Sequence, residues 1–329
     1  MDELDGWLPF HLNLTPGKLE VSWLSPGDTA IVEPFFYQSV EKIKRANEHA
    51  VQVYSDISVL TNLASLEPVT EPSGFIFHMS RCGSTLVSNA LRSVQGSLCI
   101  SEAQPVTVLM TPYSHDYWPF EEGNWEAKRD DLIRGVMAAF GRVKNTKYLF
   151  VKFRSWNTLF VRTVRSIWPF VPCLFLYRDP VEVMVSNLLK HPAWWSFRES
   201  PRTKSLFFGW AEDDNGGATD EEYCARVLAA ICGSMRDSLD ENTVLLRYEH
   251  INTRTVQQIA TFFGVPEQDI SIPSLDRCLR YYSKDMTSQT IFTSDTHGKR
   301  EMASPQAVEC AKRFVNPIID ELDMLQCGR

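Results

Sequence analysis

The chain has none of the segments that take a protein into or across a membrane. Its first residues, MDELD, are acidic and lack the basic and then apolar layout of a signal peptide. No apolar stretch approaches the roughly 20 residues that span a bilayer. We therefore expect a cytoplasmic protein with no membrane partner.

The sequence also lacks closely spaced cysteine pairs, clustered metal ligands and a net positive charge. The eight cysteines are scattered without a Cys-x-x-Cys pair, and no cluster of His, Cys and acidic residues is visible. This pattern predicts reduced thiols and no bound metal. The net charge of −8 argues against a nucleic-acid partner, so any phosphate site has to be a local basic pocket.

The sequence does contain enough apolar material for a large core, because 44% of its 329 residues are hydrophobic. From residue 71 onward strand and helix patterns alternate, which predicts an α/β fold: a three-layer P-loop domain whose central, mainly parallel sheet is flanked by helices. The expected strands are 75–79, 98–100, 148–153, 173–177 and 243–248. The expected helices are 84–94, 128–142, 180–190, 220–239, 253–263 and 304–325.

Residues 1–70 are predicted to form a small N-terminal extension to the P-loop domain at 71–329. The extension would hold short strands at 19–23 and 30–32 and a helix at 35–50, and it ends in a Pro- and Gly-containing junction. Pro317 is expected to kink or split the last helix. Residues 191–219 fit no regular element and are interpreted as a long loop, of the kind that often serves enzymes as a lid.

The most informative segment is 74–91, an apolar strand followed by a small-residue turn and a helical pattern. Such a unit points backbone N–H groups and the positive end of a helix at one spot, which favours an anion. Arg81 supplies a cation in the turn, and Ser84 and Thr85 supply hydroxyls. The turn therefore predicts a phosphate site, but not an ATPase loop, because Gly-x-x-x-x-Gly-Lys-[Ser/Thr] is absent.

Two other interpretations apply to the same turn. A cysteine phosphatase needs an Arg six residues after its thiolate Cys, and Ser88 stands at that place after Cys82, which excludes the class. An ordinary turn with a surface Arg stays open on this segment alone, because short motifs have a real false-positive rate.

A second strand that runs into a helix lies at 174–190. Asp179 is a good N-cap, Pro180 a good first helical residue, and Glu182 completes the pattern of a capping box. Arg178 at the strand end offers a bidentate donor for phosphate, and Ser186 offers one neutral donor. The segment predicts a second phosphate site.

The two segments occur in the order found in sulfotransferases that use 3′-phosphoadenosine 5′-phosphosulfate (PAPS), and the chain resembles that superfamily. Arg-Cys-Gly-Ser-Thr-Leu is similar to its 5′-phosphosulfate loop, and Arg178 with Ser186 to its 3′-phosphate site. The spacings are most similar to those of tyrosylprotein sulfotransferases. The chain overall, including residues 1–70, looks more like uncharacterised bacterial sulfotransferase-family proteins.

The resemblance implies roles for further residues. Glu102 falls at the position of the catalytic base in the tyrosylprotein branch, and Lys152 at that of a Lys that stabilises the leaving phosphate. Tyr248, within Arg-Tyr-Glu, matches a family Tyr, and Lys299 lies where members bring a basic loop to the donor. The implied catalytic residues are Glu102, Lys152 and Arg81, and the implied donor contacts are Arg81, Cys82, Gly83, Ser84, Thr85, Leu86, Arg178, Ser186, Tyr248 and Lys299.

These features predict sulfuryl transfer from PAPS to a hydroxyl acceptor, either a small molecule or a peptide side chain, without a metal. A kinase-like phosphotransferase and a non-catalytic nucleotide-binding module remain as alternatives. His115 is a competing base, since cytosolic small-molecule sulfotransferases use His. His78 is interpreted as a core residue or a support for the site. Neither the acceptor nor the oligomeric state can be read from the sequence.

Overall fold

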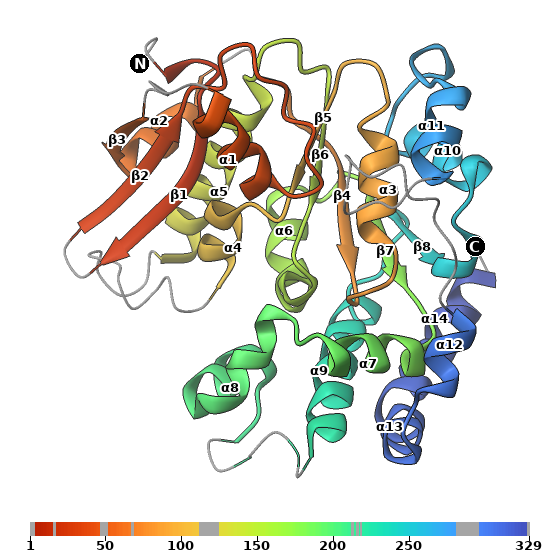
Figure 1. The fold of residues 1–329 in the computed structure, drawn as a ribbon. Coiled ribbons are helices and arrows are strands. Elements are labelled where there is room, and N and C mark those ends of the chain that lie inside the picture. Colours follow the sequence, from red (N-terminus) through yellow and green to blue (C-terminus); the bar gives the residue numbers. More distant parts are fainter. Residues whose placement is uncertain are drawn as a thin grey trace.

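A five-stranded parallel sheet forms the centre of the molecule, in the order β5-β6-β4-β7-β8 (Figure 1). Its strands are β4 (Pro72–His78), β5 (Ser97–Ser101), β6 (Tyr148–Lys152), β7 (Cys173–Tyr177) and β8 (Thr243–Arg247). The predicted α/β fold and its five strands are confirmed. The computed structural model describes residues 4–15, 18–46, 52–66, 69–111, 125–211, 214, 217, 219–280 and 296–327.

The order of the strands creates a place for a ligand. The chain leaves β4 toward β5 at one edge of the sheet, and after β6 it passes β4 to reach β7 and β8 at the other edge. In open α/β sheets, ligands bind at the carboxyl ends of the strands where the winding reverses in this way. The carboxyl end of β4 is therefore the expected centre of the site.

Aromatic side chains pack on both faces of the sheet. Phe75 of β4 lies in register with Val151 of β6, so it projects from the face opposite to that of Phe150. Phe75 contacts Trp168 with ring centroids 5.5 Å apart, and Phe150 contacts Phe263 at 5.6 Å. Because both faces are buried, the strands read as continuous apolar runs, which made them easy to predict.

Helices form the two outer layers. On the Phe263 side, α3 packs on the sheet and against α10 and α11, and on the Trp168 side η3, a 3-10 helix, packs with α6 and α9. Their bounds are α3 (Ser84–Leu91), α10 (Thr253–Phe262), α11 (Ile272–Arg280), η3 (Ser155–Phe160), α6 (Val161–Ile167) and α9 (Asp220–Arg236). The remaining helical elements of this domain are α4 (Gln104–Met110), α5 (Trp125–Gly141), α7 (Pro180–Leu189), η4 (Ala193–Glu199), α8 (Pro201–Phe208), η5 (Tyr248–His250), η6 (Glu267–Asp269) and α12 (Thr296–Glu301).

One predicted detail of the helical layers is confirmed, and another is wrong in part. The last helix is split as expected, because a π-helical turn at Ala311–Val315, just before Pro317, separates α13 (Pro305–Cys310) from α14 (Asn316–Cys327). The interpretation of 191–219 as a loop is wrong in part, because this segment contains η4 and α8. Ser200 Oγ caps α8 by accepting a hydrogen bond from Thr203 N at 3.2 Å.

The N-terminal portion is a second, antiparallel sheet that packs on α4 and α5. It consists of β1 (Leu8–Thr15), β2 (Lys18–Leu24), α1 (Phe36–Ala46), β3 (Gln52–Asp56) and α2 (Ser58–Ala64). The strand expected at 30–32 is not formed, and β1 and β3 were not predicted. The contact with α5 is so close that a Cβ on Gly135 would lie 2.0 Å from the carbonyl oxygen of Leu60. The apolar residues of this portion join one continuous core with the rest of the chain.

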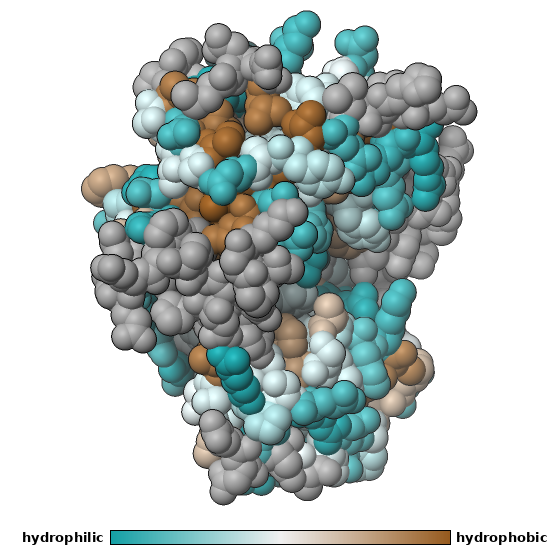
Figure 2. Space-filling view, turned by 90° about the vertical axis from the view of Figure 1, so that its left-hand side faces the viewer, coloured by the Kyte–Doolittle hydropathy of each residue, from teal (hydrophilic) through white to brown (hydrophobic). Residues whose placement is uncertain are grey.

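Figure 2 shows the face of the molecule on the side of this sheet. Apolar side chains gather in its upper part, at the height of the N-terminal sheet, and the lower part is mainly polar. Within the described ranges, no helix combines the length and the apolar character needed to cross a bilayer.

Candidate functional site

A cavity of about 480 Å³ opens where the winding of the parallel sheet reverses. Small-molecule sites typically measure roughly 300–1,000 Å³. All five strands deliver a lining residue just beyond their carboxyl ends: the turn 80–85 after β4, Glu102 after β5, Arg154 after β6, Arg178 after β7 and Tyr248 after β8. The fold thus brings together residues that are far apart in the sequence.

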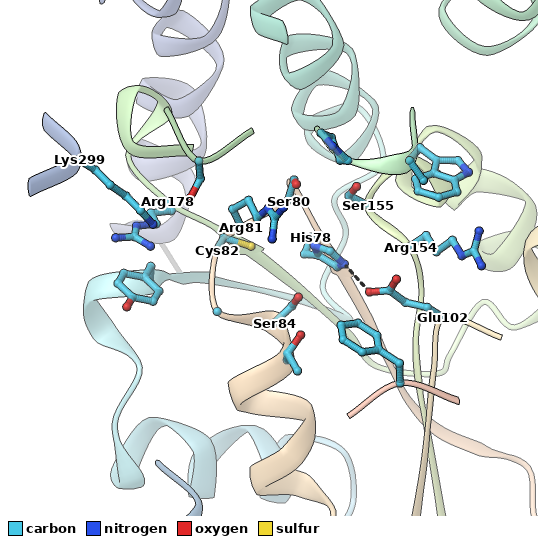
Figure 3. A pocket seen from close by; sticks show the side chains of 18 of the residues that line it. His78, Ser80, Arg81, Cys82, Ser84, Glu102, Arg154, Ser155, Arg178 and Lys299 are labelled. Atoms are coloured by element: carbon cyan, nitrogen blue, oxygen red, sulfur yellow. Dashed lines mark ion pairs between the residues drawn. The ribbon is translucent and has the colours of Figure 1, made fainter. Parts of the chain in front are cut away.

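The cavity has two ends with different chemistry. Figure 3 shows Lys299 and Arg178 at one end, Glu102 and Arg154 at the other, and Arg81 of the turn between them. We call these the Arg178 end and the Glu102 end. Four positive groups and one carboxylate therefore lie along one continuous space, in an acidic protein.

The backbone of the turn 80–85 is strained. Ser80 and Arg81 have positive φ angles of 110° and 49°, and Glu102 at the far end has 60°. These are three of the four described non-glycine residues with positive φ. Ser80 Oγ donates a hydrogen bond to Asn187 Oδ1 at 3.2 Å, and Arg81 donates to the carbonyl oxygen of Lys190 at 3.0 Å. Strained backbone of this kind costs about 1–3 kcal/mol per residue and concentrates at functional sites.

Gly83 is required at its place by space as well as by its φ of 82°. A Cβ there would lie 2.9 Å from the ring of Tyr248 and 2.7 Å from Ile251. The next residue, Ser84, begins α3, so the positive end of that helix faces the cavity, as do the Ser84 and Thr85 side chains. Leu86, by contrast, does not line the cavity and is buried.

Cys82 lines the cavity but is not a nucleophile. Its thiol is fully buried and donates to the carbonyl oxygen of Leu176 at 3.2 Å. Burial raises the pKa of the Cys82 thiol to about 11, so it stays protonated near neutral pH. This agrees with the exclusion of the cysteine phosphatase class.

At the Arg178 end, one carboxylate holds two arginines. Arg178 Nε donates to Glu182 Oε2 at 2.7 Å, while Arg300 Nε donates to Glu182 Oε1 at 3.0 Å. The Arg178 guanidinium also lies over the ring of Tyr248, 3.9 Å from its centroid. Ser186 also lines the cavity.

The capping box predicted at α7 is therefore wrong in part. Asp179 is the N-cap, and its Oδ1 accepts a hydrogen bond from Glu182 N at 3.1 Å. The Glu182 side chain does not return to the N-cap backbone, because it binds Arg178 and Arg300 instead. The ion pairs of Glu182 with the two arginines thus take the place of its contact with the N-cap backbone.

At the Glu102 end, Lys152 Nζ forms an ion pair with the Glu102 carboxylate. Lys152 is almost fully buried and does not line the cavity, whereas 23% of the Glu102 side chain is exposed. His78 Nε2 lies 4.0 Å from Glu102 Oε1, as the dashed line in Figure 3 marks. It also lies 3.1 Å from the carbonyl oxygen of Phe153 and must donate to it, because a carbonyl oxygen only accepts.

These neighbours decide the charge of Glu102. Burial on its own would raise the pKa of the carboxyl, but the Lys152 ammonium, and after it His78, overcome that effect. The net result is a pKa below the ordinary value of 4.5, so Glu102 is ionised at neutral pH. An ionised carboxylate at a cavity wall can accept a proton.

Several lining residues were not predicted. His78, taken as core or support, is buried and also lines the cavity. Phe35 and Tyr37 reach it from the N-terminal portion, and Arg154 and Trp156 from the start of η3. No motif marks these four. The remaining lining residues without a predicted role are Ser80, Ser155, Pro192 and Ala193.

Arg92 explains how the N-terminal portion reaches the cavity. Its guanidinium donates to the carbonyl oxygen of Pro34 at 3.3 Å and to Ser101 Oγ at 2.9 Å. Pro34 precedes Phe35, and Ser101 precedes Glu102. One half-buried arginine therefore ties two neighbouring lining residues together.

Two further predictions concern residues or groups outside this geometry. His115 lies in 112–124, outside the described residues. In the part of the chain that the structure describes, no group of three or more His, Cys, Asp and Glu residues is arranged to hold a metal ion.

No family model and no curated protein sequence matches the chain. Solved structures similar to it include a sulfotransferase from Alicyclobacillus acidocaldarius, with 13% identity and a TM-score of 0.44 over 78% of this chain and 96% of that one. The sulfotransferase domain from the curacin biosynthetic pathway has 12% identity and a TM-score of 0.45, over 75% of this chain and 98% of that one. Sulfotransferase STF1 from Mycobacterium tuberculosis has 12% identity and a TM-score of 0.35, over 64% of this chain and 77% of that one. The names of all three describe them as sulfotransferases.

Proposed function

We propose that this protein transfers a sulfuryl group from PAPS to a hydroxyl acceptor. The observation that supports the proposal is the layout of the cavity, in which two cationic subsites and one ionised carboxylate follow one another. The turn 80–85 and the start of α3 suit the 5′-phosphosulfate. Arg178, Ser186 and Lys299 suit the 3′-phosphate. Glu102, at the far end, suits the acceptor hydroxyl.

The proposed chemistry is an in-line displacement. The acceptor oxygen forms a bond to sulfur while the bond from sulfur to the bridging phosphate oxygen breaks, and that electron pair stays on the phosphate. The proton of the acceptor hydroxyl passes to Glu102. Arg81 and the N–H groups of the turn stabilise the charge that the phosphate gains.

Lys152 has a different role in this proposal from the one that the resemblance implies. Because its ammonium is buried against Glu102, it acts through that carboxylate, which it keeps ionised and oriented. Tyr248 has a comparable supporting role, since its ring holds the Arg178 guanidinium in place.

Calorimetry with two nucleotides tests the donor site. We expect adenosine 3′,5′-bisphosphate to bind roughly 10- to 100-fold more tightly than adenosine 5′-monophosphate, because a hydrogen bond to a charged group is worth about 1.5–3 kcal/mol. Arg178→Gln should remove most of this difference. Arg162→Gln, which removes an arginine that does not line the cavity, should leave it intact. Equal affinities of the wild-type protein for both nucleotides would overturn the proposal.

A further inference from the structure

The side chains that line the Glu102 end indicate which kind of acceptor would fit there. Phe35, Tyr37 and Trp156 line the cavity together with Arg154. The Phe35 ring lies beside the ammonium of Lys152, the partner of Glu102, which places it at this end. Phe35 and Tyr37 stack with ring centroids 6.0 Å apart, and Trp156 is held edge-on against Phe197 at 5.8 Å. Fixed aromatic rings favour a flat, apolar body between them.

Arg154 adds a positive charge at the same end. Its guanidinium is half-buried in the cavity wall and lies 5.1 Å from the centre of the Trp156 ring. The backbone is fixed here by a hydrogen bond from Arg154 N to Asn157 Oδ1 at 3.1 Å. Arg154 is therefore a positioned cation on an aromatic wall.

The charge of Arg154 is placed differently from those of Lys152 and Arg178. Lys152 is paired with Glu102, and Arg178 with Glu182. Among the described residues no carboxylate forms an ion pair with Arg154, and Glu102 acts on it over a longer distance. Since arginine keeps its charge at all physiological pH values, an anionic ligand group is the natural partner for its planar donors.

We propose that the acceptor is a flat aromatic hydroxyl compound that carries a carboxylate, with the ring between Phe35 and Trp156 and the carboxylate on Arg154. The hydroxyl then faces Glu102. The transfer step rests on the proposed function, but the binding of the acceptor does not. An anionic acceptor also needs Arg154 for a second reason: without it, the ionised Glu102 would repel the carboxylate.

A matched pair of phenols tests this binding without turnover. The probes are 3-(4-hydroxyphenyl)propionate and its uncharged amide, titrated calorimetrically into the protein without nucleotide, so that the result does not depend on the donor site. We expect the acid to bind roughly 10-fold or more tightly than the amide, as for a charge-assisted hydrogen bond. Arg154→Gln should bring the acid to the affinity of the amide, and Arg162→Gln should preserve the preference. Phe35→Leu should weaken both probes by a similar factor.

The outcomes separate the two proposals. Equal binding of the two probes to the wild type, or a preference for the acid that survives in Arg154→Gln, overturns the inference. Unchanged binding of both probes to Phe35→Leu overturns its aromatic part. Failure of the proposed function would show instead as equal binding of the 3′,5′-bisphosphate and the 5′-monophosphate, measured with no phenol present. Circular dichroism of each variant checks that it is folded.

Discussion

Single residues at the Glu102 end determine how the cavity can handle a proton. Three groups converge there: a carboxylate with a positive φ, a buried ammonium and a histidine whose Nε2 is committed to a carbonyl oxygen. Lys152 and His78 both lie against the Glu102 carboxylate, so Glu102 is ionised and held in one position. This arrangement leads to two predictions at the scale of the residue.

Glu102→Gln removes the proton acceptor while keeping the shape of the side chain. We expect turnover to fall by roughly 10²- to 10⁴-fold, the range for loss of a general base. The affinity for adenosine 3′,5′-bisphosphate should not change, because the carboxylate lies at the opposite end of the cavity from Arg178. Labelled-donor transfer to the best acceptor from a screen measures the first quantity. Near-normal turnover in this variant, with loss of turnover in His115→Ala, would move the base to His115.

The pH dependence of transfer should report the pairing of Glu102 with Lys152. The base works only when ionised, so kcat/KM is lost as the pH falls through its pKa. In the wild type that pKa lies below 4.5, and we expect a flat profile from pH 8 down to about 5. Lys152→Met leaves the burial that raises the pKa and removes the charge that lowers it. Its profile should therefore decline within that range, and superimposable profiles would contradict the proposed role of Lys152.

Close helix packing holds the N-terminal portion on the rest of the molecule. α2 lies directly on α5, at a place where only glycine leaves room for a carbonyl group. We expect Gly135→Ala to destabilise the protein by roughly 1–3 kcal/mol, because the Leu60 backbone has to move. Denaturant unfolding measures the change.

Gly233→Ala is the matched control for that variant. Gly233 also lies in a helix, α9, but the nearest atom to an added Cβ is 3.9 Å away. This change should be neutral, or should stabilise by up to about 1 kcal/mol, because alanine favours the helix. Equal effects at the two positions would mean that the contact with α2 does not limit the packing.

Elements whose own residues specify them were predicted well. The parallel strands are continuous apolar runs. Asp179 and Ser304 cap their helices as their sequences indicate, because each side chain accepts a hydrogen bond from the backbone N–H three residues later. The strand β3 was missed because its partner, β2, is distant in the chain. β1 forms a hairpin with the adjacent β2, but it contains Pro9 and a register shift, which obscure its strand pattern. The lining residues of the turn 80–85 and of the Arg178 end could be predicted, because they directly follow strands in the order that the resemblance implies. Phe35 and Trp156 could not be predicted, since only tertiary packing brings them to Glu102.

At the scale of the whole molecule, the cavity carries its positive charge in side chains. In the proposed function, Arg81, Arg178 and Lys299 supply the positive charge that Mg²⁺ supplies in a kinase. We therefore expect transfer to continue at an unchanged rate in excess EDTA. A kinase of similar turnover is the positive control for chelation. Activity that disappears with EDTA and returns with Mg²⁺ would favour the phosphotransferase alternative.

The wall built by Phe35 and Tyr37 has a consequence for how such a protein can change over generations. The groups assigned to the donor follow the strands of the central sheet, whereas these two rings belong to a stretch outside it. Substitutions in that stretch can alter which hydroxyl compound fits and leave the nucleotide contacts as they are. Evolution can thus change the acceptor while the donor stays the same. Related proteins with different substrates should therefore differ most within residues 1–70.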